Sequence, residues 1–484
     1  MADERVVSEI VTKFLLNTCR LRPLLTRHGV QAVQNCARIA TWHPVDDAEA
    51  DYIPLITGSV AEFYIEPMLP LVGDIDVMHH ASAQLAIPRG HPPPTQLPDE
   101  FSNYVKVYEI VDSHLPGYVY LELRYLLTEC IEDDKYCYFE YDKKQHYFAE
   151  VMGDSRSHGP ARLTDNSGLP EVLSVDTVVC ARCLSWPSQA ADWPIRHRNY
   201  DWPDSATVDR VASNGCDMVQ VAHRQCKQDE WTGKCQWRLS FSRAEIVLLN
   251  SWMPVQQVVY HMLRFFMKTN RLIDSADNSE RFLVSNYHIK TLMLWAAELK
   301  PRSWWTESLN LVRICVELLH TLSVCLTDTY CPQYFINNCN LLDNSLSVGM
   351  VASKLTLIDE AYLSTWLVNN YIGKCAQLCS DYIPQLFDYA NNITKLENLV
   401  TAIVEFRLNV SLSDLWDIVK CAQLNIVASI SNCSVTAKSC ARWINELTKF
   451  HVGPLLSEYC SAVVYLHVSY KISRDGFNEN LIMF

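Results

Sequence analysis

Residues 58–78 read GSVAEFYIEPMLPLVGDIDVM, and this stretch decides how the fold is interpreted. Its last part, residues 74–78 (DIDVM), alternates polar and apolar side chains and predicts a half-buried strand. Because residues i and i+2 of a strand share a face, we expect Asp74 and Asp76 to lie side by side, with the apolar residues between them directed at the core. Two adjacent carboxylates repel each other and lower stability unless a cation lies between them.

A third carboxylate, Asp176, lies on a β-branched run at residues 172–179 that predicts another strand. Together with Asp74 and Asp76 it would form a site of hard oxygen ligands suited to Mg²⁺, with Mn²⁺ as an alternative. Two such ions about 3.5–4 Å apart can activate a hydroxyl group and neutralise a leaving pyrophosphate. We therefore predict that Asp74, Asp76 and Asp176 are both the metal ligands and the catalytic carboxylates.

The turn at Gly58-Ser59 precedes Asp74 by fourteen intervening residues and has the chemistry of a phosphate-binding turn. Gly58 allows the backbone to approach a phosphate closely, Ser59 offers a hydroxyl donor, and a helix starting at residues 60–64 would add its N-terminal amides. An isolated Asp-x-Asp or Gly-Ser pair is common and carries little meaning alone. The ordered combination, with a strand aspartate a hundred residues after Asp76, predicts nucleotidyl transfer, in which an alcohol attacks the α-phosphate of a bound triphosphate.

These residues and three later segments resemble a known family. The later segments are Val175-Asp176, residues 237–242 (WRLSFS) and residues 285–291 (SNYHIKT). In this order they are similar to the cyclic GMP–AMP synthase-like (cGAS-like) receptors of the male-abnormal (Mab) domain nucleotidyltransferase family, over roughly residues 5–370. The resemblance implies an α+β nucleotidyltransferase core with a mixed twisted sheet, an all-helical lobe, and a nucleotide cleft between them. It also implies synthesis of a cyclic dinucleotide from nucleoside triphosphates such as ATP and GTP, activated by nucleic acid.

Carried over by position, the resemblance assigns three further residues to nucleotide binding beside Gly58 and Ser59. Arg238 would contact a base and phosphates, and Tyr287 would stack on a nucleobase, an interaction worth about 1–3 kcal/mol. Arg264 is aligned with a basic residue that reaches the triphosphate from the helical lobe. Two alternatives stay open, namely that Tyr287 is a core aromatic and that Arg238 is the partner of a surface salt bridge.

The chain departs from the vertebrate members of that family between the WRLSFS segment and Tyr287. Those members carry a Cys/His zinc insertion there, whereas residues 243–284 contain one histidine, His261, and no cysteine. We therefore expect no zinc site. Because the zinc insertion grips DNA, we favour duplex RNA over DNA as the activating double-stranded nucleic acid.

The composition limits the class of protein. The 484 residues are 49% hydrophobic and 20% charged, which suits a globular protein of two to three domains. The net charge of −14 means that any nucleic acid would need a local basic patch. Nineteen cysteines in so long a chain indicate buried thiols in a reducing cytosol rather than a secreted disulfide framework. With neither a signal peptide nor a membrane span predicted, we expect a cytoplasmic protein without membrane association.

The first half of the chain shows mixed patterns. An amphipathic helix is predicted over residues 5–20, and strands at 105–110, 118–127 and 237–241. Residues 86–100 and 155–168 are expected to be loops, and the acidic, aromatic residues 129–141 an exposed turn or insertion.

The second half is predicted to be helical. Ser242 with Glu245 fits a capping box, and residues 243–273, 286–299, 303–326 and 353–372 have helical periodicity. We divide the chain into a nucleotidyltransferase core at 1–241, a helical lobe at 242–370 that completes the nucleotide cleft, and a helical extension at 371–484 of unknown role.

Several other motifs favour structural roles. Cys180 and Cys183 have the spacing of half a metal site but end a predicted strand, so structural thiols are expected. His79 and His80 are expected on a loop or at the surface. The three Trp-Pro pairs that begin at residues 186, 193 and 202 are interpreted as packing and turn devices.

Two basic clusters could contact a nucleic acid, although solvated surface is the simpler interpretation of each. The first comprises Arg20, Arg22, Arg27 and His28. The second comprises Arg196, His197, Arg198, His223, Arg224, Lys227, Trp231 and Lys234.

We therefore predict a Mg²⁺-dependent nucleotidyltransferase that makes a cyclic dinucleotide when nucleic acid orders its active site, as an innate immune sensor would. One alternative is a catalytically silent family member that acts as a scaffold or developmental regulator. Another is an enzyme that makes linear oligonucleotides at the same site.

Overall fold

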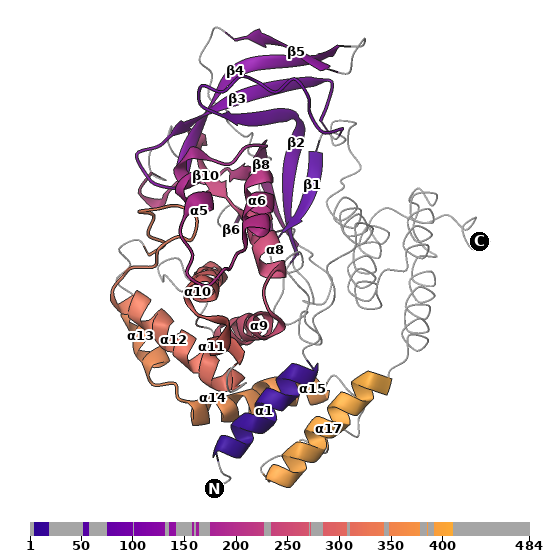
Figure 1. Cartoon of the computed structure of the whole chain (residues 1–484), viewed down its shortest axis with the longest axis vertical. Coiled ribbons are helices and arrows are strands. Elements are labelled where there is room, and N and C mark those ends of the chain that lie inside the picture. Colours follow the sequence, from indigo (N-terminus) through magenta and orange to yellow (C-terminus); the bar gives the residue numbers. More distant parts are fainter. Residues whose placement is uncertain are drawn as a thin grey trace, which may run out of the picture.

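The structure is a computed structural model of the whole chain. It describes residues 4–18, 52–57, 75–99, 101–130, 135–141, 157–158, 161–163, 175–226, 234–270, 272, 284–306, 310–342, 348–377, 385 and 392–409. Helices and strands are labelled as in Figure 1.

One mixed sheet organises the first half of the described chain. It contains β1 (Tyr52–Thr57), β2 (Ile75–Pro88), β3 (Tyr104–Asp112), β4 (Tyr118–Cys130), β5 (Lys135–Glu140), β6 (Ser157–His158), β7 (Ala161–Leu163), β8 (Val175–Cys183), β9 (Cys216–Val219) and β10 (Gln236–Ser240). The strand order is β1-β2-β3-β4-β10-β9-β8-β7-β6, β5 pairs with β4, and β2 also pairs with β8. The pairings of β2 with β3 and with β8 are parallel, and the other pairings are antiparallel.

Helices make up the second half of the described chain. The described α-helices of the first half are α1 (Glu4–Thr18), α5 (Asp192–Ile195) and α6 (Ser205–Ser213). Those of the second half are α8 (Ser242–Asn250), α9 (Pro254–Thr269), α10 (Asn286–Leu299), α11 (Arg302–Thr306), α12 (Leu311–Thr327), α13 (Val348–Thr356), α14 (Glu360–Leu367), α15 (Gly373–Gln377) and α17 (Ile393–Asn409). Short turns of other helix types are η2 (Ser188–Ala190), η3 (Arg224–Cys226) and η4 (Val368–Ile372). The predicted fold class, a mixed sheet followed by helices, is therefore confirmed.

The strands form where the sequence alternates. The predicted strands at 74–78, 105–110, 118–127, 172–179 and 237–241 fall on β2, β3, β4, β8 and β10. Along β3 and most of β4, buried residues alternate with more exposed ones, which is the pattern of a strand with one face on the core. The expectation of a loop at 155–168 is wrong in part, because β6 and β7 lie within it.

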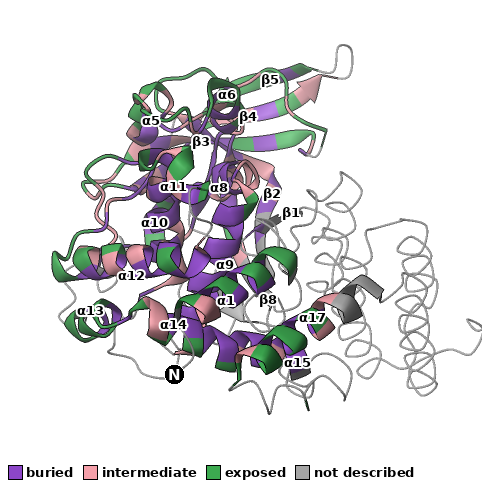
Figure 2. Ribbon diagram, turned by 60° about the horizontal axis from the view of Figure 1, so that its bottom comes forward, coloured by how far each residue is buried: buried purple, intermediate pink, exposed green. Residues whose placement is uncertain are grey.

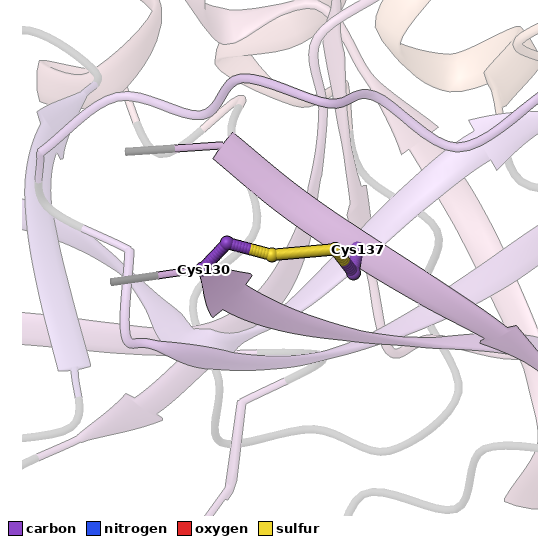
Figure 3. Close-up of a disulfide and its surroundings, with 2 residues drawn as sticks. All are labelled: Cys130 and Cys137. Atoms are coloured by element: carbon purple, nitrogen blue, oxygen red, sulfur yellow. A yellow bond between two sulfur atoms is a disulfide. The ribbon is translucent and has the colours of Figure 1, made fainter. Parts of the chain in front are cut away.

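The expectation of an exposed turn or insertion at 129–141 is wrong in part, because the segment is exposed but holds a strand. Strand β4 runs to Cys130 and β5 follows as the next strand of a hairpin, with Cys130 joined to Cys137 by a disulfide (Figure 3). Since this disulfide joins two of the nineteen cysteines, the expectation of buried free thiols does not hold for this pair.

The helices pack on one another and on the sheet through a continuous apolar core. Figure 2 shows α9 and α10 as buried along most of their length, whereas α12 and α13 expose one side. Helix α9 begins with Pro254 in its first turn, and the Gln256 side chain accepts a hydrogen bond from the Met253 N–H (2.8 Å). Helix α1 packs against α9, α12, α14 and α17, so the first element of the chain lies among the helices (Figure 1).

The predicted capping box at the start of α8 is not formed. The helix begins after Phe241, and no side chain caps its first turn. Glu245 is buried and instead forms an ion pair with Lys290 of α10, 2.8 Å between the charged atoms. This pair joins α8, which follows the sheet directly, to a helix of the second half.

The Trp-Pro segment packs as predicted. Trp186 and the fully buried Trp193 contact each other with ring centroids 5.4 Å apart, and both contact Phe335. Among the described helices, none is long and apolar enough to cross a membrane.

Candidate active site

The centre of the candidate site is a row of paired backbone positions. Asp76 of β2 is the register partner of Asp176 on the parallel strand β8, and on its other side it is the partner of Thr57 on β1. Asp176 is in turn paired with Leu163 of β7. Residues a hundred positions apart in the sequence therefore occupy neighbouring positions in the sheet.

Gly58, Ser59 and Asp74 lie outside the described residues, as do the side chains of Asp76 and Asp176. Gly58, the first residue of the predicted phosphate-binding turn, directly follows Thr57 in the sequence, and Thr57 is the register partner of Asp76. Among the described side chains, no group of three or more His, Cys, Asp or Glu is placed to hold a metal ion. The roles of Asp74, Asp76 and Asp176 as metal ligands and catalytic groups therefore stay predictions.

Two of the residues assigned to nucleotide binding come together from different halves of the chain. Arg238 is exposed on β10, and Tyr287 lies half-buried in the first turn of α10. Burial and the nearby Glu245 carboxylate raise the pKa of Tyr287, while Lys290, a hydrogen bond from Gln333 and the charge of Arg238 oppose that rise. The phenol of Tyr287 is therefore neutral, and the guanidinium of Arg238 lies within electrostatic range of it.

Three residues around Tyr287 were not identified from the sequence. Lys290, one helical turn later, lies with its ammonium nitrogen 5.8 Å from the centre of the Tyr287 ring and pairs with Glu245. Gln333 donates a hydrogen bond to the Tyr287 hydroxyl (3.1 Å). The helical spacing of Tyr287 and Lys290 could have indicated the contact between these two residues. Gln333 and Glu245 could not be found in this way, because each is more than forty residues away in the sequence.

Arg264, the remaining residue assigned to nucleotide binding, is buried. It is on α9 with 7% of its surface exposed, and its guanidinium carbon is 5.4 Å from the centre of the Tyr260 ring. Burial lowers the pKa of His261 to about 3, and the positive charge of Arg264 acts in the same direction. His261 is therefore neutral. The predicted contact between Arg264 and a triphosphate stays a prediction, and the burial leaves little of its surface to make one.

A buried charge network lies further along the strand that carries Asp76. Asp217 of β9 is fully buried and accepts from Arg243 of α8 (3.1 Å), and His80 of β2 lies 2.9 Å from the same carboxylate. Arg182 of β8 lies 3.6 Å away. The expectation that His80 lies on a loop or at the surface is therefore wrong, because the carboxylate of Asp217 satisfies its ring nitrogen inside the sheet.

Burial acts to raise the pKa of the Asp217 carboxyl, but His80 and then Arg243 outweigh it and lower the pKa to about 2. Asp217 is therefore ionised at neutral pH, and its contacts tie β2, β9 and the start of α8 together. Cys180 and Cys183 on β8 are buried free thiols, in agreement with their predicted structural role. Cys183 is the register partner of Cys216.

Two arginines of the second basic cluster are engaged with a carboxylate of the helical half. Arg196 and Arg198 both approach the buried carboxylate of Glu298 on α10, at 2.8 and 3.5 Å. Arg196 also lies over the rings of Trp295 and Tyr334, at 4.5 and 4.8 Å. Solvated surface is therefore the wrong interpretation for these two arginines, because they link the segment after α5 to α10. Contact between this cluster and a nucleic acid stays a prediction. The first cluster, at residues 20–28, lies outside the described residues.

Comparison with known families agrees with this fold. Residues 111–251 match the Mab-21 protein nucleotidyltransferase domain, and residues 256–351 match the Mab-21 protein HhH/H2TH-like domain. Two successive segments of the chain thus match a nucleotidyltransferase-fold domain and a helical domain that are described for Mab-21 proteins. Asp176, Arg238, Arg264 and Tyr287 lie within these matches, and Asp74 and Asp76 lie before them.

The relatives found are distant. A segment is 31% identical over 159 residues to a mab-21-like protein of Aedes aegypti, covering 32% of this chain and 40% of that one. Mab-21-like proteins of Drosophila melanogaster and Anopheles gambiae are 31% identical over 157 residues and 28% identical over 200 residues. These matches cover 31% and 40% of this chain, and 39% and 49% of the relatives. The chain thus spans half or less of the length of these curated relatives.

Proposed function

We propose that this chain is a Mg²⁺-dependent nucleotidyltransferase that makes a cyclic dinucleotide from nucleoside triphosphates such as ATP and GTP, in the manner of the cGAS-like receptors. The observation that supports it is the register pairing of Asp76 with Asp176 inside a nucleotidyltransferase-fold domain. Carboxylates at two such positions destabilise the sheet unless a divalent cation joins them.

The chemistry follows from these positions. Mg²⁺ would be held by Asp74, Asp76 and Asp176, and when bound it would activate the attacking hydroxyl and stabilise the departing pyrophosphate. Arg238 would neutralise phosphate charge from β10. Tyr287, whose phenol stays protonated, would offer a neutral aromatic face to a base. Gly58 and Ser59 would hold the triphosphate tail at the end of β1.

Double-stranded nucleic acid is the proposed activator, with RNA favoured over DNA, and the cytoplasm is the proposed site of action in innate immune sensing. The pairing of Arg196 and Arg198 with Glu298 removes two cations from the proposed contact face. That pairing favours the second candidate function, a catalytically silent family member that binds nucleotide or partners without turnover.

Turnover separates the two candidates. The purified chain is incubated with labelled ATP, GTP, CTP and UTP in Mg²⁺, with and without duplex RNA or DNA, and the products are treated with phosphatase. We expect a phosphatase-resistant product that Asp74→Asn and Asp76→Asn each abolish, while Asp209→Asn, an exposed aspartate of α6, retains it. Unchanged product from Asp76→Asn would contradict the mechanism. Nucleotide binding without product under every condition would support the silent alternative.

A further inference from the structure

Residues 331–342, called the strap below, form a closed segment between α12 and α13. Its ends are joined because the Leu341 N–H donates to the Cys331 carbonyl (2.8 Å) and the Cys331 N–H donates to the Asn340 side chain (2.8 Å). Pro332 and Asn340 form an isolated β-bridge. A segment closed in this way presents its middle residues in a fixed arrangement.

One side of the strap contacts the sheet half of the molecule. The Phe335 ring stacks on Phe241, the residue that joins β10 to α8, with centroids 4.5 Å apart and planes 15° apart. The Asn337 side chain donates to the carboxylate of Asp192 on α5 (2.7 Å). The strap is therefore anchored next to the end of the strand that carries Arg238.

The other side of the strap contacts α10. The Trp295 indole donates to the Pro332 carbonyl (2.9 Å), and the Tyr334 hydroxyl donates to the Glu298 carboxylate (2.7 Å). The strap thus bridges the sheet half to the helix whose first turn carries Tyr287.

Gln333 connects the strap to Tyr287 itself. Its side chain is buried, and its amide oxygen accepts from the backbone N–H groups of Phe335 and Ile336. A backbone N–H can only donate, so the oxygen of the amide must face the strap and the NH₂ must face the other way. That NH₂ donates to the Tyr287 hydroxyl over 3.1 Å.

We propose that Gln333 is a positioning residue that fixes the ring of Tyr287 for stacking on a nucleobase. A hydrogen bond at the hydroxyl restrains the end of the ring that is furthest from the backbone, and so restrains the tilt of the aromatic face. Because the same strap holds Phe241, the orientation of Tyr287 is linked to the strand that carries Arg238. This inference rests on the proposed nucleotide binding at Tyr287.

A double-mutant cycle tests the inference. KM for each nucleoside triphosphate and kcat are measured for wild type, Gln333→Ala, Tyr287→Phe and the double variant. A hydrogen bond between neutral groups corresponds to a change of about two- to tenfold, so Gln333→Ala should raise KM by that factor and change kcat less. In the Tyr287→Phe background, which lacks the hydroxyl, the same substitution should add less than about twofold.

A KM increase from Gln333→Ala that is equally large in both backgrounds would overturn the inference. Thr321→Ala is the control, since it removes an exposed side-chain hydrogen bond within α12 that involves neither the strap nor Tyr287; it should leave KM unchanged. If Gln333→Ala does not fold, as judged by its thermal melt, Tyr287→Phe alone decides, and an unchanged KM would overturn the inference.

Failure of the proposed function is distinguishable from failure of this inference. Binding of ATP and GTP to wild type is first measured by calorimetry in Mg²⁺. No binding and no product would remove the proposed function, and the inference with it. Binding and turnover in wild type, together with unchanged parameters in Gln333→Ala and Tyr287→Phe, would remove the inference alone.

Discussion

Asp76 and Asp176 occupy directly paired positions on the neighbouring parallel strands β2 and β8. Paired residues on adjacent strands lie close enough for their side chains to interact, and like charges at such positions are destabilising. The arrangement has a measurable consequence that does not depend on turnover, because a cation that joins the two carboxylates must stabilise the fold.

We predict that Mg²⁺ raises the melting temperature of the wild-type chain and that Asp76→Asn and Asp176→Asn each remove this effect. At about ten times its dissociation constant, a ligand of the folded state adds about 1.4 kcal/mol to the free energy of unfolding. Without Mg²⁺, either substitution should raise the melting temperature slightly, because it relieves the repulsion. The measurement is thermal unfolding with and without Mg²⁺, with Asp209→Asn as control. An equal Mg²⁺ effect in all variants would contradict the site.

The second prediction concerns the buried carboxylate of Asp217. Asp217→Asn should lower the free energy of unfolding at pH 7 by about 3 kcal/mol, because it removes the charge that His80 and Arg243 surround. The pKa of Asp217 is about 2 in the folded chain, below the ordinary value of 3.8, so its contribution is present above about pH 4 and is lost as the pH falls towards 2.

Urea unfolding of wild type and Asp217→Asn at several pH values checks this second prediction. The difference in the free energy of unfolding between wild type and Asp217→Asn should be constant above pH 4 and should become smaller below pH 4. The exposed Asp209→Asn variant provides the baseline for a solvated carboxylate. A difference that stays unchanged down to pH 2 would show that the carboxylate is not the source of the stability.

The strands could be predicted from the sequence where one face of the sheet is buried. The alternation along β3, which is buried at Val105 and Val107, is such a case. Strand β5 could not be predicted in this way. All of its residues except Tyr136 are exposed, so neither face imposes an alternating pattern.

The polar contacts of the site could not be predicted because they join distant residues. Only the fold brings His80, 137 residues away in the sequence, to the carboxylate of Asp217. Glu245 has the sequence spacing of a capping residue relative to Ser242. In the folded chain its carboxylate instead forms an ion pair with Lys290. The pairing of Asp76 with Asp176 depends on the register of two strands, which sequence spacing does not define.

The third prediction concerns the disulfide between Cys130 and Cys137. It closes a short loop in the β4–β5 hairpin, so its removal by Cys137→Ser or by reduction should cost about 2 kcal/mol of hairpin stability. Because β5 pairs only with β4 among the described strands, the loss should be local. Hydrogen exchange should become faster in residues 135–140 and stay unchanged in β10. Alkylation of both thiols in the unreduced protein, detected by mass spectrometry, would show that the disulfide is not formed.

The last prediction concerns Glu298, the buried carboxylate shared by Arg196, Arg198 and the Tyr334 hydroxyl. Glu298→Gln leaves two arginines without their counter-charge in a largely buried place, and should lower the free energy of unfolding by about 3 kcal/mol. Glu9→Gln is the matched control, since Glu9 pairs with Arg5 at the surface of α1, where an ion pair contributes about 0.5 kcal/mol or less.

Urea unfolding measures the loss in the free energy of unfolding for Glu298→Gln and for Glu9→Gln. Hydrogen exchange then shows which residues Glu298→Gln destabilises. Tyr334 belongs to the strap and Arg196 to the segment after α5, so amides in residues 331–342 should exchange faster while those of α12 stay protected. Equal losses of stability in Glu298→Gln and Glu9→Gln would mean that the arginines find other partners or water when the carboxylate is removed. In that case Glu298 would not be the group that holds the strap and α10 to the segment after α5.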